Sequence, residues 1–281
     1  MALVIKTSKV KAPEGAQLLY RDALVSEGSL LLADFSNRGT LLDFSLTDRN
    51  PVKDLSRDVS EKLGIDNSVL FRSNNPSLEL TEGYGLTFDQ LGGNPGSADN
   101  LGIDYGTDLL NYLSSKTSGI LVTFWARIQE GITQGGGIVS STGDGGGNNF
   151  PLRIAVTITE STKRATLSVA GTPYHVDGLD NISQISVEYR GSGLNNRTFL
   201  NGFETGVTSD PAAEFGTPLS SLVIGKPDQT NRAGVIYRYL IEDLDISGRS
   251  ADSVVKKDWE YCTGTGEYEG LPTKRPFIDT L

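Results

Sequence analysis

The chain has 281 residues, 37% of them hydrophobic and 21% charged, with a formal net charge of −10 at pH 7. This length can bury a large core in one β domain or in two smaller ones. The negative charge argues against nucleic-acid partners, because contact with the phosphate backbone requires clustered lysine and arginine. A single cysteine, Cys262, excludes an intrachain disulfide and any cysteine-based zinc site.

The N-terminal residues differ in charge from the rest of the chain. Three lysines stand within the first eleven residues of an otherwise acidic protein. A short apolar run beside them could add a strand to an acidic neighbouring copy, while a frayed terminus is the alternative. We therefore predict an N-terminal arm over residues 1–28, with interface residues Leu3, Val4, Ile5, Lys6, Lys9 and Lys11.

Short strands and few helices are expected up to residue 119. Strand-like patterns cover 29–34, 40–46, 69–71 and 78–80, and helical spacing covers 52–63. Residues 83–119 are expected to form a loop insertion that contacts a partner, with one or two helical turns at 107–115.

The second half of the chain reads as a series of antiparallel strands. Residues 120–128 alternate clearly, and further strands are predicted at 137–140, 152–158, 165–169, 185–189, 222–225 and 235–246. Asn201-Gly202 predicts a hairpin, because both central residues of a type I′ turn need positive φ. Residues 251–262 read as a closing helix. About ten to twelve strands favour two stacked antiparallel sheets.

The order of these features resembles the concanavalin A-like (laminin-G-like) jelly-roll family. The similar features are a Phe124-Trp125 strand, the Asn201-Gly202 turn, an Ile224-Gly225 strand end and a long strand with the acidic pair Glu242-Asp243 before a short helix. The resemblance implies an all-β, two-sheet antiparallel sandwich over residues 29–262, with the extended arm, one or two short helices and a tail at 263–281.

Carboxylates are the residues that could carry catalysis in such a fold. Glycoside hydrolases of this fold place an acid and a nucleophile on one strand face. Glu242 and Asp243 are adjacent and point to opposite faces, whereas Asp243 and Asp245 are expected to share one. No third carboxylate follows at the required spacing, and the single histidine, His175, has no nucleophile motif around it. We predict no catalytic residue and no cofactor.

Two kinds of ligand contact are worth naming. Jelly rolls of the lectin type often bind calcium through loop oxygens, which makes Asp144, Asn148 and Asp177 candidate ligands, although solvated turns explain these residues more simply. Tyr84, Tyr105 and Tyr174 are candidate glycan contacts, because a tyrosine ring can stack on a sugar; the alternative is a core or rim position.

Residues 239–244, followed by Ser247-Gly248-Arg249, also resemble jelly-roll chains of tailed-bacteriophage structural proteins. This resemblance implies a non-enzymatic virion protein, a capsid decoration or a tail or neck component. Its partners would be other copies of itself and neighbouring virion proteins. The alternative is a carbohydrate- or receptor-binding module of a tail fibre or spike, and an endoglycanase is the less favoured third.

The apolar N-terminal run is too short for a secretory signal, and no run approaches the roughly 18 residues of a membrane span. We therefore expect synthesis in the host cytoplasm and no membrane partner.

Overall fold

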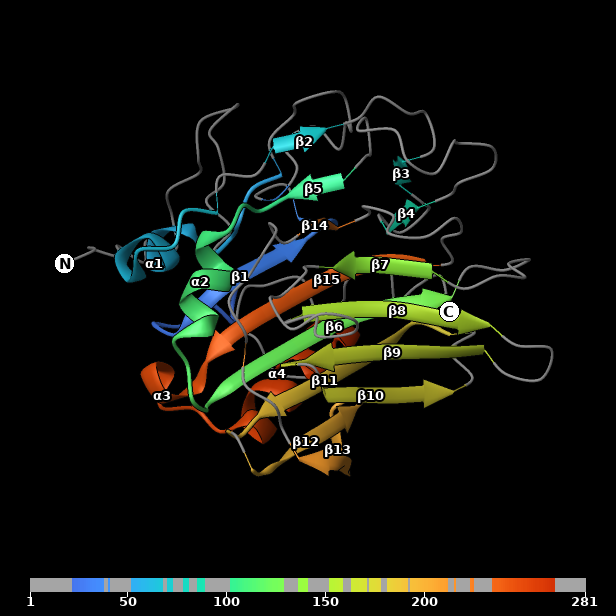
Figure 1. The fold of residues 1–281 in the computed structure, drawn as a ribbon. Coiled ribbons are helices and arrows are strands. Elements are labelled where there is room, and N and C mark those ends of the chain that lie inside the picture. The colour runs from blue at the N-terminus through green and yellow to red at the C-terminus, as the bar shows by residue number, and fades with distance from the viewer. Residues whose placement is uncertain are drawn as a thin grey trace.

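Two antiparallel sheets, packed face to face, form the body of the protein in the computed structural model (Figure 1). The structure describes residues 22–37, 40, 52–67, 70–72, 78–80, 85–88, 102–128, 136–140, 152–158, 163–170, 172–177, 181–191, 193–211, 215, 223–224 and 234–265. Residues 41–46 of the predicted strand at 40–46, most of the arm and most of the tail lie outside these ranges. Within them, no helix has the length and apolar character needed to cross a bilayer.

Sheet A contains eight of the described strands, in the order β13-β12-β11-β6-β15-β4-β3, with β1 also paired to β15. β4 and β1 share one edge of β15: β4 pairs at residues 235–236 and β1 at residues 238–242. The strands are β1 (Ser29–Asp34), β3 (Leu78–Leu80), β4 (Leu86–Phe88), β6 (Ile120–Ile128), β11 (Ser183–Tyr189), β12 (Asn195–Leu200), β13 (Phe203–Pro211) and β15 (Gly234–Asp243).

Sheet B contains seven of the described strands, in the order β10-β9-β8-β7-β14-β5-β2. In Figure 1 its strands β7 to β10 lie in front of sheet A. They are β2 (Leu70–Arg72), β5 (Gly102–Asp104), β7 (Gly136–Ser140), β8 (Leu152–Ile158), β9 (Lys163–Val169), β10 (Thr172–Asp177) and β14 (Val223–Ile224). The predicted fold class, a two-sheet antiparallel sandwich, is confirmed.

The main core lies between the sheets and follows the alternation of the strands. On β6, Ile120, Val122 and Phe124 face the core, where they meet Leu167 and Val169 of β9. The intervening β6 residues face the other way, as the period of two requires. Helix α2 (Asp108–Ser114) adds Leu109, Leu110 and Leu113 to the same core, so the interval 83–119 is partly built into the sandwich.

Helix α4 (Ala251–Thr263) covers the outer face of sheet A, which lies behind the strands in Figure 1. Ser250 caps its start by accepting a hydrogen bond from the Ser253 backbone N–H, and Gly264, at φ 73°, ends it. The buried face of the helix packs against the outward side chains of β6, β12 and β15; the members of this second cluster include Leu121, Phe199, Leu240, Val254 and Val255. Helix α4 therefore covers the part of the outer face of sheet A that β6, β12 and β15 form.

The remaining helices are short. The predicted helix at 52–63 is present as α1 (Arg57–Ser60) and a 3₁₀ turn, η1 (Glu61–Leu63). The predicted Asn201-Gly202 turn is confirmed, with φ of 51° and 88°.

The predicted strand 235–246 is too long. β15 ends at Asp243, whose carboxylate accepts hydrogen bonds from the backbone N–H groups of Asp245 and Ile246. These bonds begin a helical turn, α3 (Leu244–Ser247), which Gly248 ends at φ 66°. Asp243 and Asp245 therefore do not share a strand face, because the side-chain cap outcompetes the extended conformation.

Candidate functional site

Two of the three predicted glycan contacts lie within the described residues, and their surroundings differ. Tyr84 lies outside the described residues. Tyr105 is 0% exposed in the core, with its ring edge-on to Tyr239 at 5.6 Å between centroids, and a ring in that position cannot stack on a sugar at the surface. Tyr174 of β10 is half-buried, and its hydroxyl lies 2.9 Å from Thr205 Oγ1 of β13. Of the two that the structure describes, only Tyr174 lies at a rim.

The calcium candidates are only partly described, since Asp144 and Asn148 fall outside the described ranges. Asp177 is exposed and forms a two-pronged ion pair with Arg164, at 2.6 and 3.0 Å. The hydrogen bond from Arg164 lowers the pKa of Asp177. Across the described part of the chain, no group of three His, Cys, Asp or Glu side chains could hold a metal ion. The predicted arm residues 3–11 are likewise not described.

The outward face of β9 and β10 carries polar cross-strand pairs. Arg164 stands opposite Asp177, and Thr166 opposite His175, with 2.8 Å between Thr166 Oγ1 and His175 Nδ1. Partial burial and the nearby Arg164 charge lower the pKa of His175. The histidine therefore belongs to an exposed polar surface.

The carboxylates at the end of β15 are held in structural contacts. Asp243 accepts a hydrogen bond from Tyr112 at 2.8 Å and pairs with Lys116, besides capping α3. Burial alone would raise the pKa of Asp243, but the hydrogen bonds from Lys116 and Tyr112 outweigh it, and the pKa is lowered. Glu242 is fully buried and forms an ion pair with Arg249. Neither carboxylate is left available as an acid or a nucleophile.

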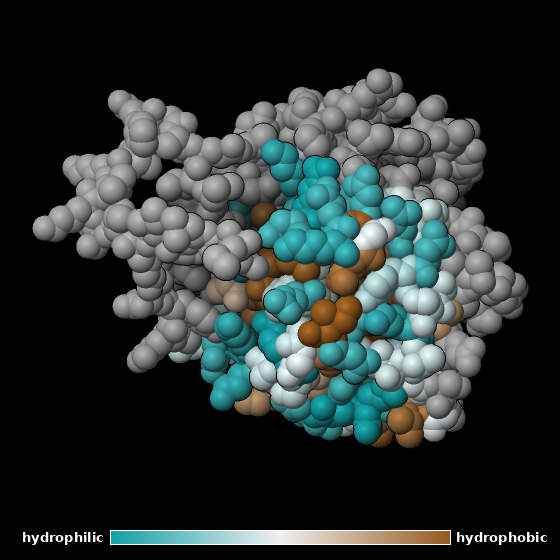
Figure 2. Space-filling model, turned by 90° about the vertical axis from the view of Figure 1, so that its left-hand side faces the viewer, coloured by the Kyte–Doolittle hydropathy of each residue, from teal (hydrophilic) through white to brown (hydrophobic). Residues whose placement is uncertain are grey.

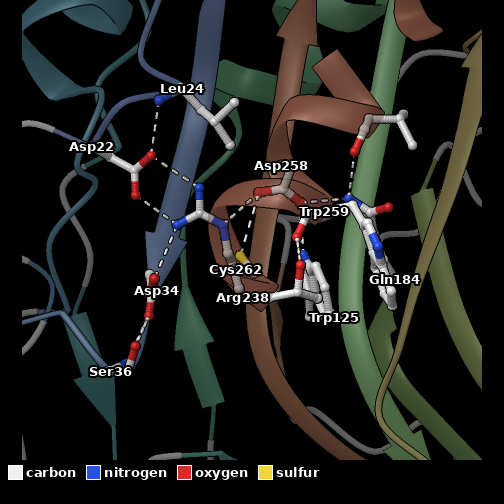
Figure 3. A network of polar contacts seen from close by, with 12 residues as sticks. Asp22, Leu24, Asp34, Ser36, Trp125, Gln184, Arg238, Asp258, Trp259 and Cys262 are labelled. Carbon is white, nitrogen blue, oxygen red and sulfur yellow. Dashed lines mark hydrogen bonds and ion pairs between the residues drawn. The ribbon is translucent and has the colours of Figure 1, made fainter. Parts of the chain in front are cut away.

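Arg238 of β15 is the centre of a buried polar network (Figure 3). Its guanidinium donates two hydrogen bonds to Asp22, at 2.7 and 3.0 Å, one to Asp34 at 3.0 Å and one to Asp258 at 2.9 Å. The Tyr261 ring lies 5.6 Å from the guanidinium carbon. Burial opposes the charged form of Arg238, but the three carboxylates dominate and raise its pKa. Arg238 is therefore charged at any physiological pH.

Asp258 of α4 extends this network across sheet A. Its Oδ2 accepts hydrogen bonds from Trp125 Nε1 at 2.6 Å and Gln184 Nε2 at 2.7 Å. Gln184 in turn accepts a hydrogen bond from the Gly202 backbone N–H, and Trp125 stacks on Trp259 at 5.2 Å between centroids. The network joins the segment before β1 to β1, β15, β6, β11 and α4. It acts as a scaffold, since every member is satisfied from within the protein.

A second arginine, Arg197 of β12, also contacts three carboxylates, but at the surface. It lies 3.0 Å from Glu188 and 2.8 Å from Asp252, and it also pairs with Glu204. The Arg197 side chain is 21% exposed and that of Asp252 is 54% exposed. This cluster fastens β12 and β13 to α4.

A second buried polar centre is Asp54. Its Oδ1 accepts hydrogen bonds from the Leu32 backbone N–H and from Ser56, and its Oδ2 accepts one from Asn67 at 2.8 Å. Burial raises the pKa of Asp54, while these hydrogen bonds oppose the shift. The contacts hold the segment before α1 against β1, which is a structural role.

Figure 2 views the molecule from the side where α2 and α3 lie in Figure 1. The described part of this face is mostly hydrophilic, with a small hydrophobic area near its centre. Ile246 of α3 is 38% exposed. The described surface on this side offers no broad apolar face for a partner.

No known protein-family model and no curated protein matches this chain. Several solved structures are similar to it in fold. The chain is similar to the botulinum neurotoxin serotype D binding domain, with 13% identity and a TM-score of 0.51, over 84% of this chain and 52% of that one. It is also similar to Trypanosoma rangeli sialidase in complex with sialic acid, with 12% identity and a TM-score of 0.52, over 85% of this chain and 33% of that one.

The chain thus spans about half of the first relative and a third of the second. At this level of identity the likeness concerns the fold. It agrees with the strand order described above: the protein has a two-sheet, jelly-roll β-sandwich fold.

Proposed function

We propose that this protein is a non-enzymatic, lectin-like binding module that holds a glycan or a protein receptor through the edges and loops of its sandwich. The main observation behind the proposal is that the carboxylates at the end of β15 are held in structural ion pairs. Glu242 and Asp243 are the carboxylates that come closest to a hydrolase pattern in the sequence, and both are buried in ion pairs, with Arg249 and Lys116 respectively. The lectin-like fold supplies the general class of the proposed activity.

The segments that pack on the outer side of sheet A limit where a partner can bind. Helix α4 and the segment 22–28 occupy the outer side of sheet A, where Arg249 also holds the Leu24 carbonyl at 2.9 Å. The outward face of β9 and β10 and the sandwich edge between β10 and β13 carry exposed polar groups. These are the described surfaces on which a ligand can be sought.

Two assays on the purified chain test the proposal. A glycan array should show saturable binding, while the same preparation should release no reducing sugar from β-glucans, xylan or galactans. Asp243→Asn should leave binding unchanged and alter stability instead. Hydrolysis that Asp243→Asn abolishes would overturn the non-enzymatic assignment, and a blank array together with no captured receptor ectodomain would overturn the binding assignment.

The narrower hypothesis, a structural protein of a tailed-bacteriophage virion, stays a prediction from the sequence resemblance. Its predicted interface arm, residues 3–11, lies outside the described part of the chain. Mass spectrometry of purified particles tests it by counting this chain against the main shell protein. Tens to hundreds of copies would support a decoration or repeated tail role, a few copies a fibre or spike component, and absence would exclude the virion.

A further inference from the structure

Exposed apolar side chains gather on the hairpin that β12 and β13 form. Of the large hydrophobic residues that are exposed in the described part of the chain, Leu194, Phe203 and Val207 belong to this hairpin, and Ile246 lies on α3. Phe203 is 69% exposed and Val207 is 54% exposed. A single apolar residue at a surface needs no explanation, but several on one hairpin indicate an interaction surface.

Strand β13 also forms an edge of sheet A. It is the last strand in the order of the sheet, and among the described strands it pairs only with β12 (Figure 1). Part of the backbone N–H and C=O groups between Phe203 and Val207 therefore point away from β12, toward the side where no described strand follows. Such an edge is a template on which another strand can form a ladder of hydrogen bonds.

The other sheet edges are less suited to accept a strand. β2 and β3 have three residues each, and β10 contains Pro173, which cannot donate a backbone hydrogen bond. β1 is buried at every position. β13 has nine residues, and its proline is the last of them, Pro211. Among the described edges, β13 is therefore the best template for an added strand.

The surface beside Val207 is negatively charged. Val207 stands opposite Arg197 in the ladder, so the two side chains share a face of the sheet. The Arg197 guanidinium contacts the carboxylates of Glu188, Glu204 and Asp252. Three carboxylates against one guanidinium leave two negative charges in excess, and the side chains of Glu204 and Asp252 are 41% and 54% exposed.

This charge disfavours the pairing of two β13 strands with each other. The acidic groups of both copies would then approach one another, and like charges across a pair of strands are destabilising. The ladder is also irregular next to Thr198, where Gly206 has a φ of 141°. Bulges and charges of this kind protect an edge against its own copy. A basic strand would instead meet opposite charge.

The sequence contains such a strand near its start. Residues 3–11 include Lys6, Lys9 and Lys11 and no acidic residue, and the segment is as long as β13. The apolar residues at 3–5 are consecutive, so in a strand they present apolar groups to both faces. Pro13 follows and limits the ladder to this segment.

The apolar groups of β13 are likewise divided between the two faces. Phe203 stands opposite Leu200, which packs against the main core, whereas Val207 lies on the face of Arg197. An added strand with apolar residues on both faces therefore fits this edge.

We infer that the β13 edge binds residues 3–11 of a second copy of this chain as an added strand, with the lysines of the segment beside the carboxylates around Arg197. A second copy is the occupant because, within one molecule, Phe203 and Val207 remain exposed. Each copy has one such segment and one such edge, so two copies that exchange their segments form a closed two-fold dimer. This inference is independent of the proposed glycan or receptor binding.

Sedimentation velocity on the full chain, over a concentration range of about 1–100 μM, tests the inference. The chain should dimerise within this range. Phe203→Ser should weaken the dimer about tenfold, because it removes an apolar group from the centre of the contact. Ile246→Ser is the matched control, since Ile246 is also exposed but lies on α3, and it should leave the dimer unchanged.

Charge reversal tests which segment occupies the edge. Glu204→Lys should weaken the dimer about tenfold, and so should Lys6→Glu together with Lys9→Glu. The chain that carries all three substitutions should regain part of the affinity, which a purely structural effect of any one substitution would not produce. Glu204 is exposed, and circular dichroism with thermal unfolding confirms the fold of each variant.

Hydrogen exchange locates the contact. The backbone amides of residues 203–207 should exchange more slowly as the protein concentration rises, and this protection together with the charge-reversal rescue would support the inference. A chain that stays monomeric throughout the range would overturn it, and so would a dimer that none of these substitutions weakens. Protection that is independent of concentration, and is lost in the Lys6→Glu, Lys9→Glu chain, would assign the edge to the segment of the same molecule and overturn the second copy.

Discussion

Replacing Arg238 with methionine tests the idea that the buried ion network holds the sandwich together. The substitution keeps an unbranched side chain but removes the four hydrogen bonds that the guanidinium donates to Asp22, Asp34 and Asp258. Three buried carboxylates would then face one another without a cation. Breaking one buried pair costs about 3–5 kcal/mol, so we expect a loss of at least about 5 kcal/mol.

Such a loss is a large share of the roughly 5–15 kcal/mol by which a domain is stable. For a chain of this size it corresponds to a fall in Tm of about 10–20 °C. Thermal unfolding followed by tryptophan fluorescence is a suitable assay, because Trp125 is hydrogen-bonded to Asp258 and stacked on Trp259.

Arg197→Met is the matched control for this experiment. Arg197 also contacts three carboxylates, but its side chain is 21% exposed and its partners Glu204 and Asp252 are 41% and 54% exposed. Exposed ion pairs contribute about 1 kcal/mol or less, so Tm should fall by less than about 4 °C. Equal shifts for the two variants would refute the argument from burial.

A combined variant separates the cost of losing the Arg238 hydrogen bonds from the cost of leaving three buried carboxylates without a cation. Arg238→Met together with Asp22→Asn, Asp34→Asn and Asp258→Asn should recover part of the stability, because most of the cost of the single change is uncompensated charge. A combined variant that is less stable than Arg238→Met would contradict this explanation.

Further predictions concern a turn and an acid-sensitive carboxylate. Gly202→Ala should destabilise by about 2–3 kcal/mol, because φ is 88° and a Cβ would lie 2.9 Å from Trp259 Cγ. Gly64→Ala, at φ 77° with no atom within 4 Å, should cost only about 1 kcal/mol; equal costs in urea unfolding would exclude the Trp259 contact as the cause. The pKa of Asp243 is lowered by Lys116 and Tyr112 against the effect of burial, so its contribution to stability is present above the unfolded value near 3.8 and is lost as the pH falls through the folded value. Asp243→Asn should therefore reduce stability at pH 7 and flatten the acid limb of a stability–pH curve, and an unchanged acid limb would contradict the assignment.

Features that depend on a few neighbouring residues were predictable from the sequence. The alternation over residues 120–128 correctly indicated β6, and the positive φ values of Asn201 and Gly202 confirm the hairpin turn. The closing helix was predictable too, since its apolar positions recur on one face and Ser250 and Gly264 mark its ends. Each of these signals depends on neighbours within a few residues, which is the range over which backbone preferences act.

Some local signals were misleading because a nearby side chain competed with the backbone pattern. The apolar alternation at the end of β15 continues past Asp243, but the carboxylate of Asp243 caps a helical turn there. β10 was missed, because Pro173 and the polar outward residues of this strand hide its period of two. Tyr105 looked like a rim aromatic, and only the packing of α2 and β15 around it shows that it is buried.

By itself, the sequence determined the class of fold and the local turns of this protein, because alternation, glycine and capping residues act over a few positions. The tertiary structure alone decided which charged and polar side chains meet. Asp22 and Arg238 are separated by 216 residues, and no local pattern marks either as the partner of the other. Such contacts form only when segments that are distant in the chain pack together, and burial between those segments makes an ion pair energetically decisive.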